Sequence, residues 1–380
     1  MKVRWDVLLL AFGAGVIGAA VGGFPDLHVY RYGGEAVLDQ WPVYASDDPV
    51  TGYPFTYPPI GAVAFVPLAL VPGWLAAALW TAAGAGCLAA SVVVVRRALG
   101  RSTPGWLVVA SSVAALGLEP VWQNLSFGQV NLVVMLAVLV DCLGRERRWS
   151  GILIGLAAAV KLTPLVFVVL LVLVGRRSAA ARAVLTFAAT VGIGLVAVPG
   201  ASAYWTESLL DPTRVGPPAL AHNQSITGAL TRLLDGPPET LVWVAVAGPV
   251  MLATLLVAAG WWRRGDVVLA TCLGAVAMLL ASPVSWSHHW VWAVPVALVV
   301  WERGRWAACA WTLVFVARPV LWPPWGQGRE YDWGPLEHLV GNSYSLAAIA
   351  LTAWATIRLV REPETEPERA LGATPYSRSP

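Results

Sequence analysis

Long apolar stretches separated by short basic patches dominate this chain of 380 residues. A helix that crosses a bilayer needs about 20 predominantly apolar residues, and runs of Ala, Val and Leu close to that length recur along the sequence. These runs predict helices at about 6 to 22, 74 to 95, 104 to 121, 129 to 143, 183 to 198, 241 to 260, 267 to 282, 288 to 301, 305 to 321 and 343 to 359.

Two further stretches are short and interrupted by proline. The segment 57–72 is bounded by prolines and predicts a helix that dips into the outer leaflet and returns. The segment 150–175 has basic patches at both ends, so we expect it to cross twice, as two short helices that meet near Lys161. The sequence therefore predicts about twelve transmembrane helices, with both termini in the cytoplasm.

Arginine-rich patches set the expected orientation, because cytoplasmic loops carry an excess of Lys and Arg. The patches are Lys2/Arg4, Arg96/Arg97/Arg101, Arg145/Arg147/Arg148, Arg176/Arg177/Arg182, Arg263/Arg264, Arg303/Arg305 and Arg358/Arg361. With these patches inside, the long polar segments 23–56, 199–240 and 322–342 face outward. We therefore expect the chemistry of the protein on the extracytoplasmic face of the cell membrane.

Composition supports an all-α integral membrane protein, since 57% of the residues are hydrophobic and only 12% are charged. Residues 1–361 are expected to form one membrane domain, and the polar segment 362–380 a disordered cytoplasmic tail. The net charge of +3 comes with arginines clustered between apolar segments, which indicates topology and not nucleic-acid binding. The four cysteines lie far apart inside apolar runs, so no disulfide framework or zinc site is indicated.

Asp26 follows the first apolar segment and is expected at the outer membrane surface. A carboxylate at this height can act as a general base on an acceptor hydroxyl while a lipid-linked donor stays in the leaflet. The alternative is structural, because Asp is also a favoured N-cap residue.

Lys161 lies inside apolar sequence, where a charge costs at least ~2.5 to 3.5 kcal/mol by insertion scales. A phosphate would compensate this charge and would also be stabilised as a leaving group. Snorkelling to the outer interface or pairing with an acid are the alternatives.

His288 and His289 lie in the expected outer turn between two helices. Imidazole titrates near neutrality, so these side chains are candidates to orient a carboxylate or to donate to a phosphate. A metal site is disfavoured, because adjacent helical residues point about 100 degrees apart and no further ligands are evident.

The order of several short motifs resembles glycosyltransferase family 87 of the GT-C superfamily. The matching residues are Asp26 and Tyr30 in the first outer segment, Tyr57-Pro58-Pro59, Gly128-Gln129-Val130-Asn131, Lys161-Leu162-Thr163-Pro164, Asn223-Gln224-Ser225 with Arg232 beyond, and Ser282-Pro283 to His288-His289. The resemblance implies that Tyr30, Tyr57, Gln129, Asn131, Asn223, Gln224 and Arg232 bind substrate. For the amides of Gln129 and Asn131, helix capping or bonding between helices is the alternative.

The resemblance also implies a GT-C helical bundle without a metal cofactor, a polyprenyl-phosphate mannose donor and a phosphatidylinositol mannoside or related lipoglycan acceptor. Arabinofuranosyl transfer from a polyprenyl-phosphate donor belongs to the same family and stays open. In the expected mechanism Asp26 activates the acceptor, the reaction inverts at the anomeric carbon, and His288, His289 and Lys161 stabilise the site.

A secondary transporter is the competing class, because about twelve helices is also a common number there. Transporters of this size commonly show two related halves with polar residues at the midplane. Here the halves do not resemble each other and the polar residues gather in the outer segments. A scaffold without catalysis is a third possibility, but it leaves the cost of Lys161 unexplained.

Overall fold

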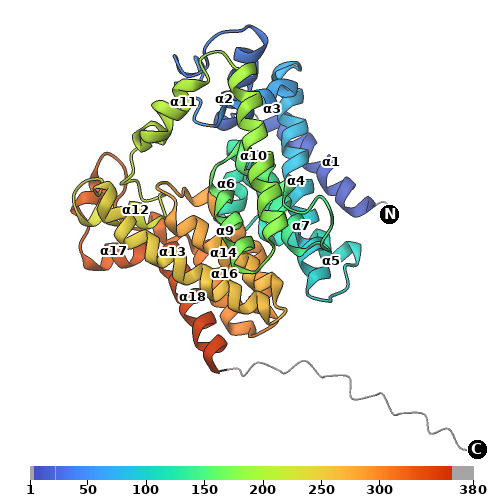
Figure 1. Ribbon diagram of the computed structural model, residues 1–380, viewed down its shortest axis with the longest axis vertical. Coiled ribbons are helices and arrows are strands. Elements are labelled where there is room, and N and C mark those ends of the chain that lie inside the picture. Colours follow the sequence, from blue (N-terminus) through green and yellow to red (C-terminus); the bar gives the residue numbers. More distant parts are fainter. Residues whose placement is uncertain (1–3, 22, 362–380) are drawn as a thin grey trace, which may run out of the picture.

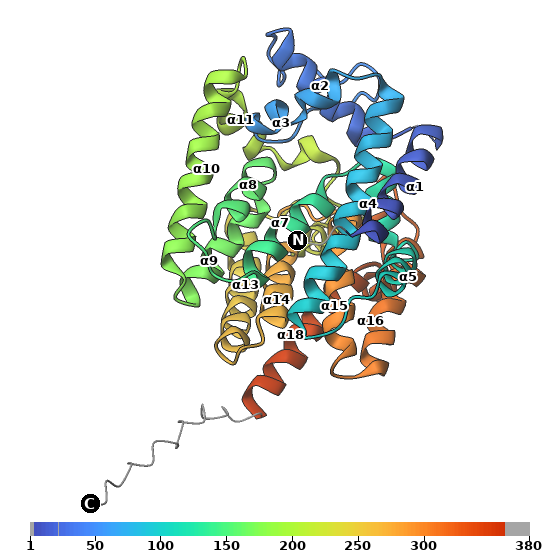
Figure 2. The same cartoon turned by 90° about the vertical axis from the view of Figure 1, so that its right-hand side faces the viewer.

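The structure is a computed structural model that describes residues 4–21 and 23–361. In this part of the chain every regular element is a helix, and strand-like pairing is limited to two isolated bridges, Asp47 with Pro54 and Asn223 with Trp286. The ribbons in Figures 1 and 2 show a bundle of helices. The all-α prediction is confirmed for these residues, whereas the predicted tail 362–380 lies outside them.

The first half of the chain contributes α1 (Trp5–Val21), α2 (Pro25–Leu38), α3 (Pro59–Ala69), α4 (Gly73–Ala98), α5 (Gly105–Ala115), α6 (Glu119–Phe127), α7 (Asn131–Leu143), α8 (Ile152–Val160), η1 (Thr163–Leu165), α9 (Val166–Leu173) and α10 (Arg177–Ala197). The second half contributes α11 (Ser202–Thr206), η2 (Ser208–Leu210), η3 (Pro212–Val215), α12 (Ile226–Leu233), α13 (Thr240–Arg263), α14 (Val267–Ala281), η4 (Ser287–Trp292), α15 (Ala293–Trp301), α16 (Arg305–Ala317), η5 (Pro319–Leu321), η6 (Arg329–Asp332), α17 (Pro335–Gly341) and α18 (Ser343–Arg361).

Four described helices, α4, α10, α13 and α18, are long and apolar enough to cross a membrane. The bent pair α5 and α6 raises this number to five, and several further apolar helices are shorter. In the most apolar 18 residues of α13 only 22% are buried within the protein, so most of its apolar side chains face outward. An exposed apolar surface of this kind is compatible with lipid. The figure of twelve spans stays a prediction.

The predicted helix at 104 to 121 is wrong in its second part. Helix α5 ends at Ala115, Leu118 is extended, and α6 leaves at an angle of 84° to α5. Pro120 lies in the first turn of α6, where its missing amide hydrogen costs nothing, but within one continuous helix it would break the hydrogen bond to residue 116. The break turns α6 toward η4, against which it packs.

The two short helices predicted within 150–175 are present as α8 and α9 with η1 between them. Lys161 follows α8 in an extended conformation, and η1 begins two residues later with Pro164 at its second position. The charged side chain of Lys161 therefore lies at the break between two apolar helices, α8 and α9.

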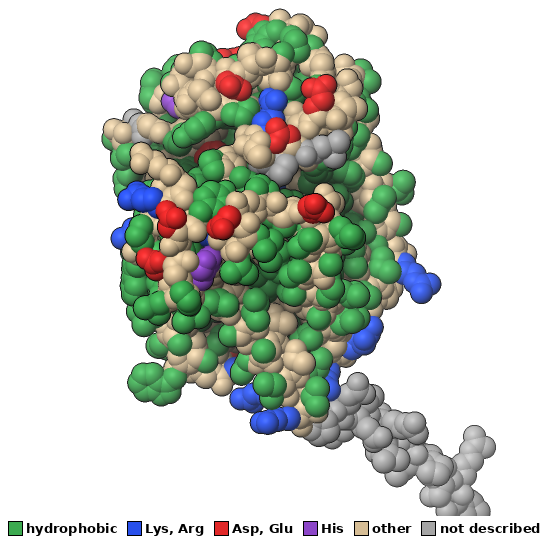
Figure 3. All heavy atoms as spheres, turned by 90° about the vertical axis from the view of Figure 1, so that its left-hand side faces the viewer, with side chains coloured by type: hydrophobic (Ala, Val, Ile, Leu, Met, Phe, Trp, Pro, Cys, Tyr) green, Lys and Arg blue, Asp and Glu red, His purple; other side chains and the backbone are tan. Residues whose placement is uncertain are grey.

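The basic patches meet at one end of the bundle. The contacts between them are Arg4 with Thr103, Arg101 with Glu302, Arg303 with Asp266, Arg263 with Leu173 and Arg176 with Glu146. Figure 3 shows one face of the molecule, on which most acidic side chains lie in the upper half and Lys and Arg gather at the lower end.

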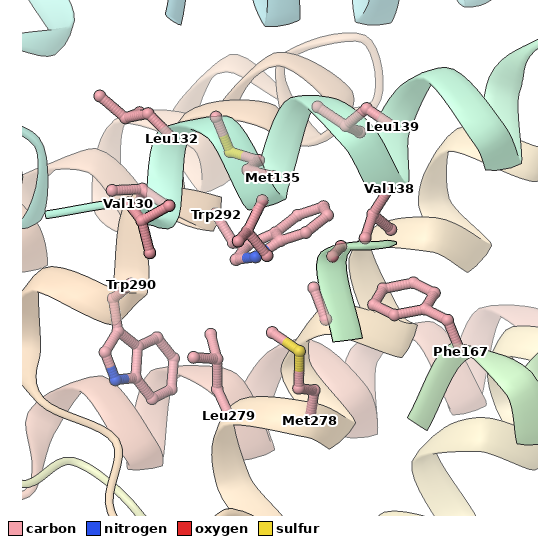
Figure 4. Close-up of a cluster of buried hydrophobic side chains, with 14 of the residues drawn as sticks. Val130, Leu132, Met135, Val138, Leu139, Phe167, Met278, Leu279, Trp290 and Trp292 are labelled. Carbon is pink, nitrogen blue, oxygen red and sulfur yellow. The ribbon is translucent and has the colours of Figure 1, made fainter. Parts of the chain in front are cut away.

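The core lies along α7 and α14. Side chains of α7 pack toward Phe167 of α9, Met278 of α14 and Trp292 of η4, as Figure 4 shows. The rings of Phe167 and Trp292 are stacked with centroids 6.0 Å apart. Because residues 268–280 of α14 are all buried, this helix fixes the segment that follows it, and that segment carries His288 and His289.

Candidate active site

Asp26 lies in the first turn of α2, directly after Pro25. The N-cap position belongs to Phe24 and not to Asp26, so the capping alternative does not describe this structure. A carboxylate in the first turn is still favoured by the helix dipole. The side chain of Asp26 is half-buried and lines a large cavity.

The turn between α6 and α7 brings Gln129 to the same place. Gly128 adopts a positive φ of 72°, and a Cβ there would lie 2.9 Å from the Cβ of Leu27 in α2. Only glycine allows both this backbone conformation and this close approach. The turn therefore rests directly on the helix that carries Asp26.

Gln129 is the centre of a buried hydrogen-bond cluster. Its Oε1 accepts from the hydroxyls of Tyr57 at 3.1 Å and Tyr30 at 3.3 Å, and the two hydroxyls are 2.8 Å apart. The Tyr30 hydroxyl also accepts from the amide of Val130 at 3.2 Å. Since both tyrosines hold the carbonyl oxygen of the amide, its NH2 group stays available for the carboxylate of Asp26.

The environment of Asp26 suits a base. Burial raises the pKa of Asp26 to about 6, although a hydrogen bond from Gln129 and the charge of Lys161 act in the opposite direction. A carboxylate with this pKa is ionised at neutral pH and binds a proton more readily than an exposed one.

Lys161 is held by two side chains. Its Nζ donates to Oδ1 of Asn131 at 2.7 Å and contacts Nε2 of His289 at 2.8 Å. When Lys161 is charged, its ammonium group has no acceptor, so His289 then accepts this hydrogen bond at Nε2 and carries its proton on Nδ1. The third proton of the ammonium group is left for a ligand in the cavity, whose wall includes Lys161.

Asn131 connects the two sides of this arrangement. Its Nδ2 donates to Asn124 at 3.0 Å and to the carbonyl of His288 at 3.2 Å, while its Oδ1 accepts from Lys161. Asn131 lines a small pocket that also includes Lys161 and His289, and is not on the wall of the large cavity.

His288 is buried, and its ring lies 4.8 Å from that of His289 and 5.5 Å from that of Phe127. Its Nε2 has no hydrogen-bond partner among the described residues, and the side chain lines the large cavity. A buried imidazole nitrogen without a partner is available to a ligand.

The cavity has a volume of about 980 Å³. Of the residues nominated from the sequence, its wall contains Asp26, Tyr57, Gln129, Lys161, His288 and His289. Tyr30 lies directly behind this wall. These residues come from positions as distant as 26 and 289, and the structure brings them together.

The cavity wall also contains residues that sequence reasoning did not nominate, among them Phe127, Arg214, His222 and Trp243. The position of His222 directly before the Asn-Gln-Ser element was a signal for its place in the wall. Arg214 is one of few cations in the outer segment 199–240, but no local motif marks it.

Asn223, Gln224 and Arg232 lie behind the wall, fully buried. Arg232 donates to the carbonyls of Ala219, Leu220 and Asn223 and to Oδ1 of Asn342. Gln224 donates to the carbonyls of Ala221 and Gly341, and Asn223 accepts from the amide of Ser285. These three residues hold the loop that carries His222 against α17, α18 and the turn before η4.

Among residues 4–21 and 23–361, no group of three or more His, Cys, Asp or Glu side chains is arranged to hold a metal ion. The cavity instead combines two carboxylates, Asp26 and Asp211, two cations, Lys161 and Arg214, and several imidazole and amide groups. This set can accept a proton from one ligand and bind an anionic group of another.

Residues 55–283 match the family model of glycosyltransferase family 87. The chain is also 36% identical, over 92% of its own length and 88% of the relative's, to a polyprenol-phosphate-mannose-dependent alpha-(1-2)-phosphatidylinositol pentamannoside mannosyltransferase of Mycobacterium tuberculosis. The chain belongs to glycosyltransferase family 87.

Two further relatives extend this similarity. A phosphatidylinositol mannoside mannosyltransferase of Mycobacterium tuberculosis, also polyprenol-phosphate-mannose-dependent, is 35% identical over 98% of this chain and 95% of its own length. The corresponding enzyme of Mycolicibacterium smegmatis is 35% identical over 92% of this chain and 88% of its own length. No solved structure matches this chain. The protein is therefore a membrane glycosyltransferase, as its sequence motifs predict.

Proposed function

We propose that this family 87 glycosyltransferase moves a mannosyl residue from a polyprenyl-phosphate donor to a phosphatidylinositol mannoside or a related lipoglycan. The names of its relatives supply the donor and the acceptor. One observation carries the proposal: Asp26 lines the same cavity as Lys161 and His289. The cavity therefore offers a base for the acceptor and, at a different position, a cationic group for the donor phosphate.

In the proposed reaction the carboxylate of Asp26 takes the proton of an acceptor hydroxyl. The hydroxyl oxygen attacks the anomeric carbon of the donor, and the bond from that carbon to the lipid phosphate breaks in the same inverting step. Lys161 stabilises the charge that develops on the departing phosphate, and His289 orients Lys161. The unpartnered Nε2 of His288 is a second group for the phosphate.

Apolar side chains on one side of the cavity suit a polyprenyl chain. Leu162 and Val166 next to the break at Lys161 face this side, as do Val244 and Met251 of α13. Val244 is 50% exposed, so this wall continues into the outer apolar surface of α13. A lipid phosphate at Lys161 therefore has an apolar path for its chain directly beside it.

The orientation that we propose places the cavity on the extracytoplasmic face of the plasma membrane, in a GT-C bundle of about twelve spans with cytoplasmic termini. The meeting of the basic patches at one end supports this orientation. Helix α14, with 15 residues, runs from that end to the cavity and is about 22 Å long. The cavity floor then lies at the depth of the outer leaflet.

The test measures transfer of radiolabelled mannose from polyprenyl-phosphate mannose to glycolipids in membranes that carry the wild-type chain or Asp26→Asn. We expect the substitution to lower transfer by roughly 10²- to 10⁴-fold, which is the contribution of a general base. Asp39→Asn is the control, because Asp39 is exposed at the other end of α2.

Undiminished transfer by Asp26→Asn at equal protein levels would remove Asp26 from catalysis. Transfer from polyprenyl-phosphate arabinose, with none from the mannose donor, would change the donor sugar and keep the reaction class.

A further inference from the structure

The outer side of the cavity carries a cation that the proposed reaction does not use. Arg214 lies in η3, and one of its terminal nitrogens donates to the carbonyl of Tyr44 at 3.1 Å. Its Nε is buried and has no hydrogen-bond partner in the described part of the chain. The carboxylate of Asp211, in the same loop, accepts from the amide and the hydroxyl of Thr213.

No carboxylate lies within ion-pair distance of Arg214 among residues 4–21 and 23–361. The charge of Arg214 acts on the exposed carboxylate of Asp211 without forming a contact ion pair. A guanidinium group that is partly removed from water and makes no such contact is suited to an anionic ligand. Because Arg214 lines the cavity, that ligand has access to it from the active site.

The depth of Arg214 in the bundle fits a lipid headgroup. Helix α10 has 21 residues and is about 31 Å long, close to the thickness of the hydrocarbon core. It begins at the basic patch around Arg176, and the segment that contains Arg214 lies between α11, at the far end of α10, and α12 (Figure 1). Phosphate groups of outer-leaflet lipids are found at this level.

Aromatic rings lie on the same side of the cavity. The rings of His222 and Trp325 are perpendicular with centroids 5.0 Å apart, and both residues line the cavity. Trp286 lies against Gly216, where a Cβ would come within 3.2 Å of its ring. Flat aromatic faces of this kind provide apolar area together with N–H groups, a combination that suits sugar rings.

We propose that Arg214 binds the phosphodiester of an anionic glycolipid acceptor, whose sugar residues lie against Trp286 and Trp325. The inference rests on the proposed function and adds a second phosphate site to it. The two cations contact different elements, since Lys161 is held by α7 and η4 and Arg214 by the first outer segment. The planar fork of arginine matches two phosphate oxygens, which lysine does not.

The first experiment compares two acceptors with the purified full chain in neutral detergent. One is a phosphatidylinositol mannoside, and the other is a diacylglycerol mannoside that lacks the phosphate. We expect Arg214→Gln to lower the ratio of kcat/KM for the anionic over the neutral acceptor about tenfold, and Arg214→Lys about threefold. Arg318→Gln is the matched control, because Arg318 is an exposed cation that lies over Trp122 and not on the cavity wall.

An unchanged ratio in Arg214→Gln would overturn the inference. So would a raised KM for the polyprenyl-phosphate donor at an unchanged acceptor ratio, because that result assigns Arg214 to the donor phosphate. If Arg214→Gln does not fold, Arg214→Lys takes its place, because it keeps the charge and removes only the planar guanidinium group. An unchanged acceptor ratio in Arg214→Lys would then overturn the inference.

The second experiment does not depend on sugar transfer. It measures binding of labelled phosphatidylinositol to the wild-type chain and to Arg214→Gln in neutral detergent, where we expect the affinity of the variant to be about tenfold lower. Equal affinity overturns the inference and leaves the proposed function intact. Wild-type binding that depends on Arg214, without transfer from either donor, refutes the proposed function and keeps the anion site.

Discussion

The surroundings of Asp26 act on its pKa in opposite directions. Burial favours its protonated form, while the amide of Gln129 and the ammonium group of Lys161 favour the carboxylate. Tyr30 and Tyr57 keep the Gln129 amide in one orientation through its carbonyl oxygen. The basicity of Asp26 is thus set by residues from α2, the segment before α3, and the turn between α6 and α7.

The first prediction at this scale is a pH profile. The pKa of Asp26 is raised to about 6, and only its ionised form accepts a proton, so kcat/KM should fall as the pH drops below about 6. At pH 5 about one tenth of the activity at neutral pH should remain. The measurement is initial mannose transfer by the purified chain between pH 4.5 and 8, with buffers of matched ionic strength.

Gln129→Leu supplies the control for this profile. Loss of the hydrogen bond that lowers the pKa of Asp26 should move the acid limb to higher pH. An acid limb that stays in place would mean that a group other than Asp26 limits the reaction.

Lys161 gives the second prediction at the residue scale. Lys161→Met keeps the length and apolar character of the side chain but removes the charge, and we expect kcat to fall by roughly 10²- to 10³-fold. Lys161→Arg should retain part of the activity, because its guanidinium group keeps the charge near Asn131 and His289. An unchanged kcat with a raised KM for the donor would restrict Lys161 to ground-state binding.

At the scale of the element, α12 carries Arg232, which the sequence predicts to bind substrate but whose hydrogen bonds in the structure all go to other parts of the protein. Arg232, on this helix, is 1% exposed and donates four hydrogen bonds, three of them to backbone carbonyls of the preceding loop. The ring of Trp333 lies 5.3 Å from its guanidinium carbon. Arg232 therefore acts on the cavity through the loop that carries His222.

We predict that Arg232→Met destabilises the protein by several kcal/mol, because three carbonyls and one amide oxygen lose a charged donor and each unsatisfied buried acceptor costs about 1 to 3 kcal/mol. Thermal unfolding in detergent should show a lower Tm, whereas the folded fraction should keep the wild-type KM for the donor. A raised KM at an unchanged Tm would restore the substrate-binding role predicted from the sequence.

The elements themselves were partly predictable. The runs of Ala, Val and Leu give α4, α13 and α14 to within a few residues, because a long apolar run in a membrane protein can satisfy its backbone only as a helix. The break at Lys161 followed from charge and proline. The sharp bend between α5 and α6 was missed because the apolar pattern continues across Leu116 and Leu118.

The amphipathic elements were harder to predict. Helices α2 and α12 lie within segments that read only as polar loops, since neither has a long apolar run. The order of the motifs predicted that Asp26 and Lys161 belong to one site, but no local pattern separates wall residues from those behind it. Asn223 and His222 are neighbours in sequence, yet only His222 lines the cavity.

At the scale of the whole molecule, the basic patches and the cavity lie at opposite ends of α13 and α14. Arg263 ends α13 at the basic end, while Trp243, near its start, lines the cavity. The ion pairs of Arg101 with Glu302 and of Arg303 with Asp266 join loops that follow different helices. One end of the bundle therefore carries most of the positive charge, and the substrate cavity is near the other.

This arrangement gives the last prediction, which concerns orientation in the membrane. In a variant without its four cysteines, Glu239→Cys, at an exposed position before the start of α13, should react with a membrane-impermeant maleimide in intact cells. Arg148→Cys, at an exposed position in the loop between α7 and α8, should react only after the membrane is opened. The positive-inside rule predicts this difference because Arg148 belongs to the basic end. The opposite labelling pattern would place the cavity on the cytoplasmic side and would require a donor and an acceptor in the inner leaflet.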